Sequence, residues 1–210
     1  MLTCHVNPSL IPLECNNCHI CQARSKLDYP FNKNLSDSDG LVAEIMNFVT
    51  VRTGYRCKRT TVHKNPDIDV YDNTGRIICR IEAKYLEGYA FMKSLQQVNL
   101  FPRETLVVDS PKLDSYIQRK AADLAAGNNI PIFVVWKFDR PCRDIGGIAV
   151  FEEIDALNAI RCQYPERSFE RKSAFNDYRY GNKLGITSKY HYSIRECKPI
   201  GDLPAMISAL

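Results

Sequence analysis

The chain has 210 residues, of which 25% are charged and 45% belong to the set AVILMFWYC. These fractions are typical of a globular domain and exclude a wholly disordered chain, a collagen and a coiled coil. The net charge of +4 permits a nucleic-acid partner without requiring one. No apolar run approaches the ~20 residues that cross a bilayer, and no secretory signal pattern is present, so we expect a cytoplasmic protein with no membrane segment.

Four of the nine cysteines lie within the first 21 residues, in a segment, 1–35, that we expect to be irregular. An odd cysteine count without a secretion signal argues against a disulfide framework. The CxxCxxC spacing can close a tetrahedral structural zinc site, and it also suits an iron–sulfur cluster; a loop with free thiols is the third interpretation. The candidate metal ligands are Cys4, Cys15, Cys18 and Cys21.

The rest of the chain, 36–210, is expected to form one domain. A helix begins at an N-cap within 36–39, carries apolar residues at helical spacing from Leu41 to Val49, and ends near Gly54. Strands are expected over 55–62, 68–72 and 76–85, the last two joined by the turn Asp72-Asn73-Thr74-Gly75.

A second helix is expected to open at Ser110-Pro111 and to close at Gly127. The continuous apolar run 130–136 predicts a central buried strand. The remaining expected elements are a strand at 145–151, a short helix at 154–160, a strand at 190–197 and a helix at 202–210. This order indicates an α/β domain with a mixed sheet.

Acidic residues and a lysine recur on the second and third expected strands. Asp67 and Asp69 share one face of their strand, and Glu82 and Lys84 share one face of the next. If the turn has two or four residues, positions whose numbers sum to 147 pair, and all four side chains lie on one face. A three-residue loop would reverse this arrangement.

Such a group suits metal-assisted phosphate chemistry. Two or three carboxylates around a water-lined pocket are the hard oxygen ligands that Mg²⁺ or Mn²⁺ prefers. The cation polarises a phosphate and lowers the pKa of a bound water, and a neighbouring lysine can orient that water or neutralise developing charge.

The pattern resembles the PD-(D/E)xK nuclease superfamily, which has the restriction-endonuclease-like fold. Pro66-Asp67 is similar to its Pro-Asp element, and Glu82-Ala83-Lys84 to its Glu-x-Lys element. Glu44, on the first expected helix, matches the helix glutamate of many members. The chain is also similar to a variant that would give Asp69 the role of Asp67, and both aspartates remain candidates.

The resemblance covers about residues 36–138. It implies a mixed β-sheet core flanked by helices and a Mg²⁺-dependent DNA endonuclease. It also implies that Asp67, Asp69 or both hold the metal with Glu82, that Lys84 lies at the attacking water, and that Glu44 assists. On the helix from Pro111, where members often carry a basic residue or glutamine, the candidates are Lys112, Tyr116, Gln118 and Lys120.

Two basic stretches are candidates for contacts with nucleic-acid phosphates. The run 52–64 contains no acid, and the stretch 161–192 alternates basic and aromatic residues in a way that suits DNA gripping or base stacking. A solvated loop packed by its own aromatics is the alternative for the second stretch. The nucleic-acid-binding candidates are Arg56, Lys58, Arg59, Lys112, Lys120, Arg171, Lys172 and Arg179.

The leading hypothesis is therefore a DNA endonuclease of restriction type or one that processes DNA. The alternatives are a non-catalytic, zinc-containing nucleic-acid-binding protein on a nuclease scaffold, and a structure-specific nuclease of junctions or repair. Because cutting both strands of a duplex usually needs two active sites, a homodimer is expected.

Overall fold

A computed structural model describes residues 2, 6–11, 31–62, 65–87, 91, 93–139, 145–170, 178–179, 182–183 and 188–210. For residues 31–37, 87, 178–179 and 182–183 it describes the backbone alone. Across these ranges, no helix combines the length and the apolar character needed to cross a membrane.

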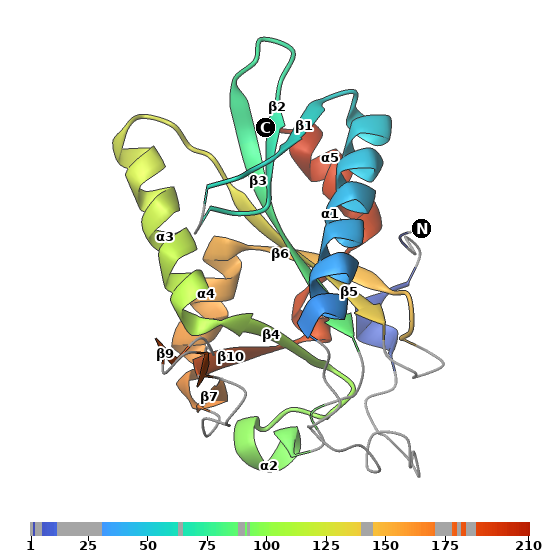
Figure 1. Cartoon of the computed structure of the whole chain (residues 1–210), viewed down its shortest axis with the longest axis vertical. Helices are drawn as coiled ribbons and strands as arrows, with labels where there is room; N and C mark the ends of the chain where they lie inside the picture. The colour runs from blue at the N-terminus through green and yellow to red at the C-terminus, as the bar shows by residue number, and fades with distance from the viewer. Residues whose placement is uncertain are drawn as a thin grey trace.

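The central layer is a six-stranded mixed sheet (Figure 1). Its spatial order is β1-β2-β3-β5-β6-β11; β3 and β5 are parallel and every other pair is antiparallel. The predicted α/β fold with a mixed sheet flanked by helices is confirmed. The strands are β1 (Arg56–Arg59), β2 (Ile68–Tyr71), β3 (Ile77–Glu87), β5 (Ile132–Asp139), β6 (Ala149–Glu153) and β11 (Lys198–Pro199).

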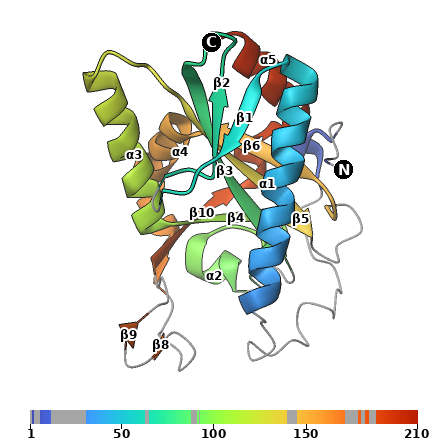
Figure 2. The ribbon, with the colours of Figure 1, turned by 45° about the horizontal axis from the view of Figure 1, so that its top comes forward.

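Helices cover both faces of this sheet, with α1 and α3 on opposite sides (Figures 1 and 2). Because both faces are buried, β5 is a continuous apolar run, as its sequence predicts. Its alternate residues enter two separate cores, one under α1 and α5 and the other under α3 and α4. These helices are α1 (Phe31–Thr53), α3 (Ser110–Ala125), α4 (Ile154–Gln163) and α5 (Leu203–Ser208).

A smaller sheet, β4-β10-β7, packs beside α3 and α4. Its strands are β4 (Thr105–Asp109), β10 (Ser188–Ser193) and β7 (Ser168–Glu170), and a short helix, α2 (Ser94–Val98), precedes β4. The remaining strand pair is β8 (Tyr178–Arg179) with β9 (Asn182–Lys183). None of β4, β7, β8, β9, β11 and α2 was expected from the sequence; β7, β8, β9 and β11 have only two or three residues, too few to show a period.

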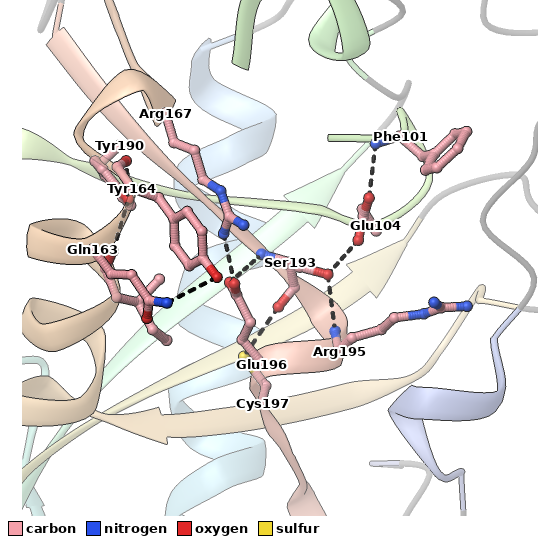
Figure 3. Close-up of polar contacts among 11 residues, drawn as sticks. Phe101, Glu104, Gln163, Tyr164, Arg167, Tyr190, Ser193, Arg195, Glu196 and Cys197 are labelled. Carbon is pink, nitrogen blue, oxygen red and sulfur yellow. Dashed lines mark hydrogen bonds and ion pairs between the residues drawn. The ribbon is translucent and has the colours of Figure 1, made fainter. Parts of the chain in front are cut away.

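A polar network fixes one end of the smaller sheet (Figure 3). The buried Glu104 accepts hydrogen bonds from Phe101 N, at 2.8 Å, and from the Ser193 hydroxyl. Glu196 accepts from Ser193 N at 2.8 Å and pairs with Arg167 at 2.6 Å. This network ties the start of β4 to the end of β10, and so it helps to position Asp109 at the far end of β4.

Helix α1 begins at Phe31, five residues before the expected N-cap. No proline or glycine interrupts residues 31–39, and each residue added to an existing helix costs little, whereas Pro30 marks a natural boundary. The strand expected over 145–151 begins at Ala149, and the strand expected over 190–197 ends at Ser193, where a 3₁₀ turn with a capping box takes over.

The β2–β3 hairpin combines two one-residue irregularities. Its loop has three residues, with Gly75 at φ +86° and Asp72 N donating to Arg76 O at 2.9 Å. A bulge between Val70 and Tyr71 then adds one residue on the β3 side. With the three-residue loop alone, Asp67 and Asp69 would lie on the opposite face of the sheet from Glu82. The bulge shifts the pairing by one more residue and so places them on the same face as Glu82. The predicted shared face is therefore right, but the paired numbers sum to 149 instead of 147.

Arg80 anchors helix α3 on the sheet. Its side chain is 3% exposed, its Nε lies 3.3 Å from Asp69 Oδ1, and its Nη1 donates to Asp123 Oδ2 of α3. One buried guanidinium thus joins two strands to a helix that lies beside them. A buried pair that loses one partner is strongly destabilised, since the other charge stays buried and unpaired.

We therefore predict that Arg80→Met lowers the free energy of unfolding by about 2–4 kcal/mol, measured by urea denaturation. The matched control is Arg76→Met, because Arg76 is 72% exposed and pairs with Asp72 at 3.4 Å. An ion pair of such an exposed guanidinium contributes little to stability. Equal, small losses in the two variants would contradict the anchoring role of Arg80.

Candidate active site

Glu82 is a charged side chain inside the protein. It is 1% exposed and projects from β3 toward α3. Its Oε1 lies 3.0 Å from Lys84 Nζ and 2.9 Å from Lys112 Nζ, and its Oε2 accepts a hydrogen bond of 2.5 Å from the Tyr116 hydroxyl. Because Lys112 and Tyr116 are four residues apart on α3, both face the sheet from adjacent turns.

Asp67 lies directly before β2, opposite Glu82. The pair Ile68–Ile81 sets this register, and Ala83 N donates to Asp67 Oδ2 at 2.9 Å. Asp67 is half-buried, and its carboxylate interacts electrostatically with that of Glu82. The structure thus brings together Asp67, Glu82 and Lys84, which the sequence pattern had singled out.

Asp109 adds a third carboxylate to this group. It ends β4 and directly precedes α3, and its Oδ2 lies 3.8 Å from Lys84 Nζ. Lys189 of β10 approaches its other oxygen at 3.7 Å. Sequence analysis missed Asp109 because β4 was not expected; the apolar run Leu106-Val107-Val108 before it was the available signal.

A groove of about 780 Å³ leads to the site. Residues 60–62 and Asn65, between β1 and β2, line one part of it, and Pro111, Lys112 and other residues of the first turns of α3 line another. Asp67 also lines the groove, whereas Glu82 is almost fully buried. A molecule in the groove would therefore meet Asp67 and Lys112 first.

The two central carboxylates have opposite electrostatic environments. Burial, and next the negative charge of Glu82, raise the pKa of Asp67 to about 6. Burial alone would also raise the pKa of Glu82, but the ammonium groups of Lys84 and Lys112 and the Tyr116 hydroxyl together lower it. Glu82 therefore stays ionised, while Asp67 retains a strong preference for a cation or a proton.

Asp69 takes part in a different interaction. It faces the same side of the sheet as Asp67 but lies against Arg80, two residues away from Glu82 in register. Of the two candidate aspartates, the structure brings only Asp67 to Glu82 among the contacts that it describes.

Glu44 lies on the other face of the sheet. Its Oε2 accepts a hydrogen bond of 2.6 Å from Lys137 Nζ. Lys137 on β5 is the register partner of Tyr85 on β3, and the Tyr85 side chain packs in the core under α1. The strand alternation that points Glu82 and Lys84 toward α3 points Tyr85 toward α1. The structure therefore does not bring Glu44 to Glu82.

The basic candidates differ in their surroundings. Arg56 and Lys58 are exposed on the edge strand β1, with Arg56 stacked 5.0 Å from the Tyr71 ring. Arg59 pairs with Asp39, and Lys120 with Glu153 and Asp155. Arg59 and Lys120 therefore form ion pairs within the chain, whereas Arg56 and Lys58 face solvent.

Several predicted residues lie outside the described part of the chain. They are Cys4, Cys15, Cys18, Cys21, Arg171 and Lys172, and of Arg179 only the backbone is described. The zinc or iron–sulfur site therefore stays a prediction, which the metal content of the purified chain would decide. Within the described ranges, no group of three or more His, Cys, Asp or Glu side chains is placed to hold a metal ion.

Comparison with known proteins gives no family assignment. No family model matches the chain, and no curated protein matches it. Two of the solved structures that are similar in fold can be named. One is Hjc, a Holliday junction resolvase from Archaeoglobus fulgidus (11% identity, 80% of this chain and 96% of that chain, TM-score 0.42). The other is D212, a nuclease from a fusselovirus (10% identity, 89% and 96%, TM-score 0.45). At this level of similarity, neither assigns an activity to this chain.

The raised pKa of Asp67 predicts a pH-dependent cost to stability. Its folded-state pKa of about 6 lies above the ordinary 3.8, so ionised Asp67 destabilises the fold above pH 6, and this penalty vanishes below about pH 4. In the presence of a chelator, Asp67→Asn should raise the free energy of unfolding by about 1–3 kcal/mol above pH 7, with the gain disappearing as the pH falls.

The control is Asp72→Asn, since the hydrogen bond from the Thr74 hydroxyl lowers the pKa of Asp72. Loss of that carboxylate should weaken the fold at high pH and have less effect at low pH. Urea denaturation of both variants and the wild type across this range measures the two trends. A constant gain for Asp67→Asn at every pH would contradict the electrostatic account.

Proposed function

We propose that the chain is a divalent-metal-dependent nuclease of the PD-(D/E)xK type that hydrolyses phosphodiester bonds in DNA, with Asp67, Glu82 and Lys84 at its active site. The observation that carries the proposal is that Asp67, which lines a groove, lies opposite Glu82, with Lys84 3.0 Å from Glu82.

The residues present fit a hard divalent cation. Two adjacent carboxylates supply oxygen donors, and their mutual repulsion is relieved by a cation between them. Mg²⁺ is often bound by only one or two carboxylates, with water and substrate phosphate completing its coordination. Asp67 and Glu82 would hold the ion, and, when bound, it would polarise the scissile phosphate and activate a water.

The protein's own groups have separate roles. Lys84, between Glu82 and Asp109, can orient the attacking water and neutralise negative charge that develops on the phosphate. The Tyr116 hydroxyl holds the orientation of the Glu82 carboxylate without touching the substrate. The buried surroundings of Glu82 strengthen these interactions because little water screens them.

The groove and the exposed basic edge favour a nucleic-acid substrate. Strand β1 carries the exposed Arg56 and Lys58 and leads directly into residues 60–62, which line the groove. Cations along such a path can contact successive phosphates. If the enzyme cuts both strands of a duplex, a homodimer would supply two active sites, and sedimentation with and without DNA measures this state.

One observation favours a second candidate, a non-catalytic DNA-binding protein on the same scaffold. Both oxygens of Glu82 already have partners inside the chain, as expected of a structural ion-pair cluster. In that case DNA binding would be insensitive to a chelator, and no substrate would be cut.

The test is cleavage of a panel of single-stranded, duplex and four-way-junction DNAs in Mg²⁺ or Mn²⁺. We expect cleavage that a chelator abolishes and that Glu82→Gln and Lys84→Met each reduce by about 10³-fold or more. The matched control is Glu152→Gln, because Glu152 is also buried and pairs with a lysine, Lys198, at 2.5 Å.

Glu152→Gln should retain near wild-type cleavage. Equal cleavage by the wild type and Glu82→Gln would identify a contaminating nuclease and reject the proposal. Chelator-resistant DNA binding without cleavage of any substrate would support the non-catalytic alternative.

A further inference from the structure

Lys112 lies against the carboxylates of the candidate metal site. Its Nζ is 2.9 Å from Glu82 Oε1, and Asp67 and Asp109 also attract its charge. A lysine in the first turn of a helix is disfavoured by the helix dipole. The three carboxylates that it faces explain why a cation lies there.

The two lysines that contact Glu82 differ in how easily their side chains could move away from it. Lys84 is 17% exposed and has a second carboxylate, Asp109, at 3.8 Å. Lys112 is 40% exposed, and it lines the groove, where a released side chain would meet a substrate. Of the two, Lys112 is the one that can move into the groove without crossing the protein interior.

Charge balance favours this exchange. In the metal-free protein, the carboxylates of Asp67, Glu82 and Asp109 balance the ammonium groups of Lys84, Lys112 and Lys189, so a bound divalent cation would add two positive charges. Retaining Lys112 as well would keep a further positive charge beside the buried Glu82, where little water screens it. A Lys112 ammonium displaced into the groove would instead be paired with one phosphodiester group.

We propose that Lys112 takes the place of the divalent cation in the metal-free protein, and that metal binding releases it into the groove as a ligand for a substrate phosphate. The inference rests on the proposed metal site at Asp67 and Glu82. Its consequence is that metal and phosphodiester bind cooperatively, because each favours the same position of Lys112, and this coupling is reciprocal.

The unaltered full chain can test this by lysine acetylation with quantitative mass spectrometry. Added Mg²⁺ should raise the acetylation rate of Lys112 about threefold or more as its ion pair breaks. A phosphorothioate oligonucleotide, added with Mg²⁺, should protect it again. Lys198 is the internal control, since it is 43% exposed and also pairs with a buried glutamate, Glu152; its rate should not change.

Mn²⁺ affinity, measured by calorimetry, gives an independent readout. Lys112→Met should bind Mn²⁺ about fivefold or more tightly than the wild type, because the Lys112 ammonium no longer competes with the metal ion for Glu82. Lys198→Met should bind it as the wild type does, and Glu82→Gln should bind it weakly.

The outcomes separate the two proposals. Mn²⁺ binding that requires Glu82, with unchanged affinity in Lys112→Met and unchanged acetylation of Lys112, would overturn this inference and leave the nuclease proposal standing. If the wild type, Lys112→Met and Glu82→Gln all fail to bind Mn²⁺, both proposals fail. Should Lys112→Met not fold, the acetylation experiment on the wild type still decides.

Discussion

The structure depends on one buried charge, the carboxylate of Glu82, which is 1% exposed between the central sheet and α3. Placing an ionised group there is costly unless cations and hydrogen-bond donors surround it. Lys84 from the same strand and Lys112 and Tyr116 from α3 supply them. The packing of the first turns of α3 on the sheet therefore depends on the contacts of Glu82, and Arg80 contacts the last turn of the same helix through Asp123.

The arrangement of carboxylates that would bind a metal ion lowers the stability of the metal-free fold. Asp67, beside Glu82, is kept where its ionised form is disfavoured, and an uncharged residue there would suit the metal-free fold better. Sites that bind a cation commonly carry such a cost, since the carboxylates that attract the ion repel one another in its absence. The lysines reduce that repulsion, and Lys112 does so from a position that is still open to the groove.

Much of this could be predicted from the sequence, because strand alternation and turn residues are local signals. They placed Glu82 and Lys84 on one face and identified β5 as a buried central strand. The prediction that Asp67 shares this face assumed a loop of two or four residues, and it holds only because a bulge offsets the three-residue loop. The pairing register could not be predicted, because the bulge at Val70 and Tyr71 depends on packing. Nor could the sequence predict that Asp69 contacts Arg80 while Asp67 lies opposite Glu82, or that Asp109 joins this group from an unexpected strand.

The central claim is that Asp67 and Glu82 together hold a divalent metal ion. It is tested most directly by anomalous diffraction at the manganese edge from crystals of the full chain grown with Mn²⁺. The account predicts an anomalous peak between the carboxylates of Asp67 and Glu82, with the Lys112 ammonium no longer in contact with Glu82. Crystals that contain Mn²⁺ elsewhere, with the Lys112–Glu82 pair intact and no peak between the two carboxylates, would contradict it.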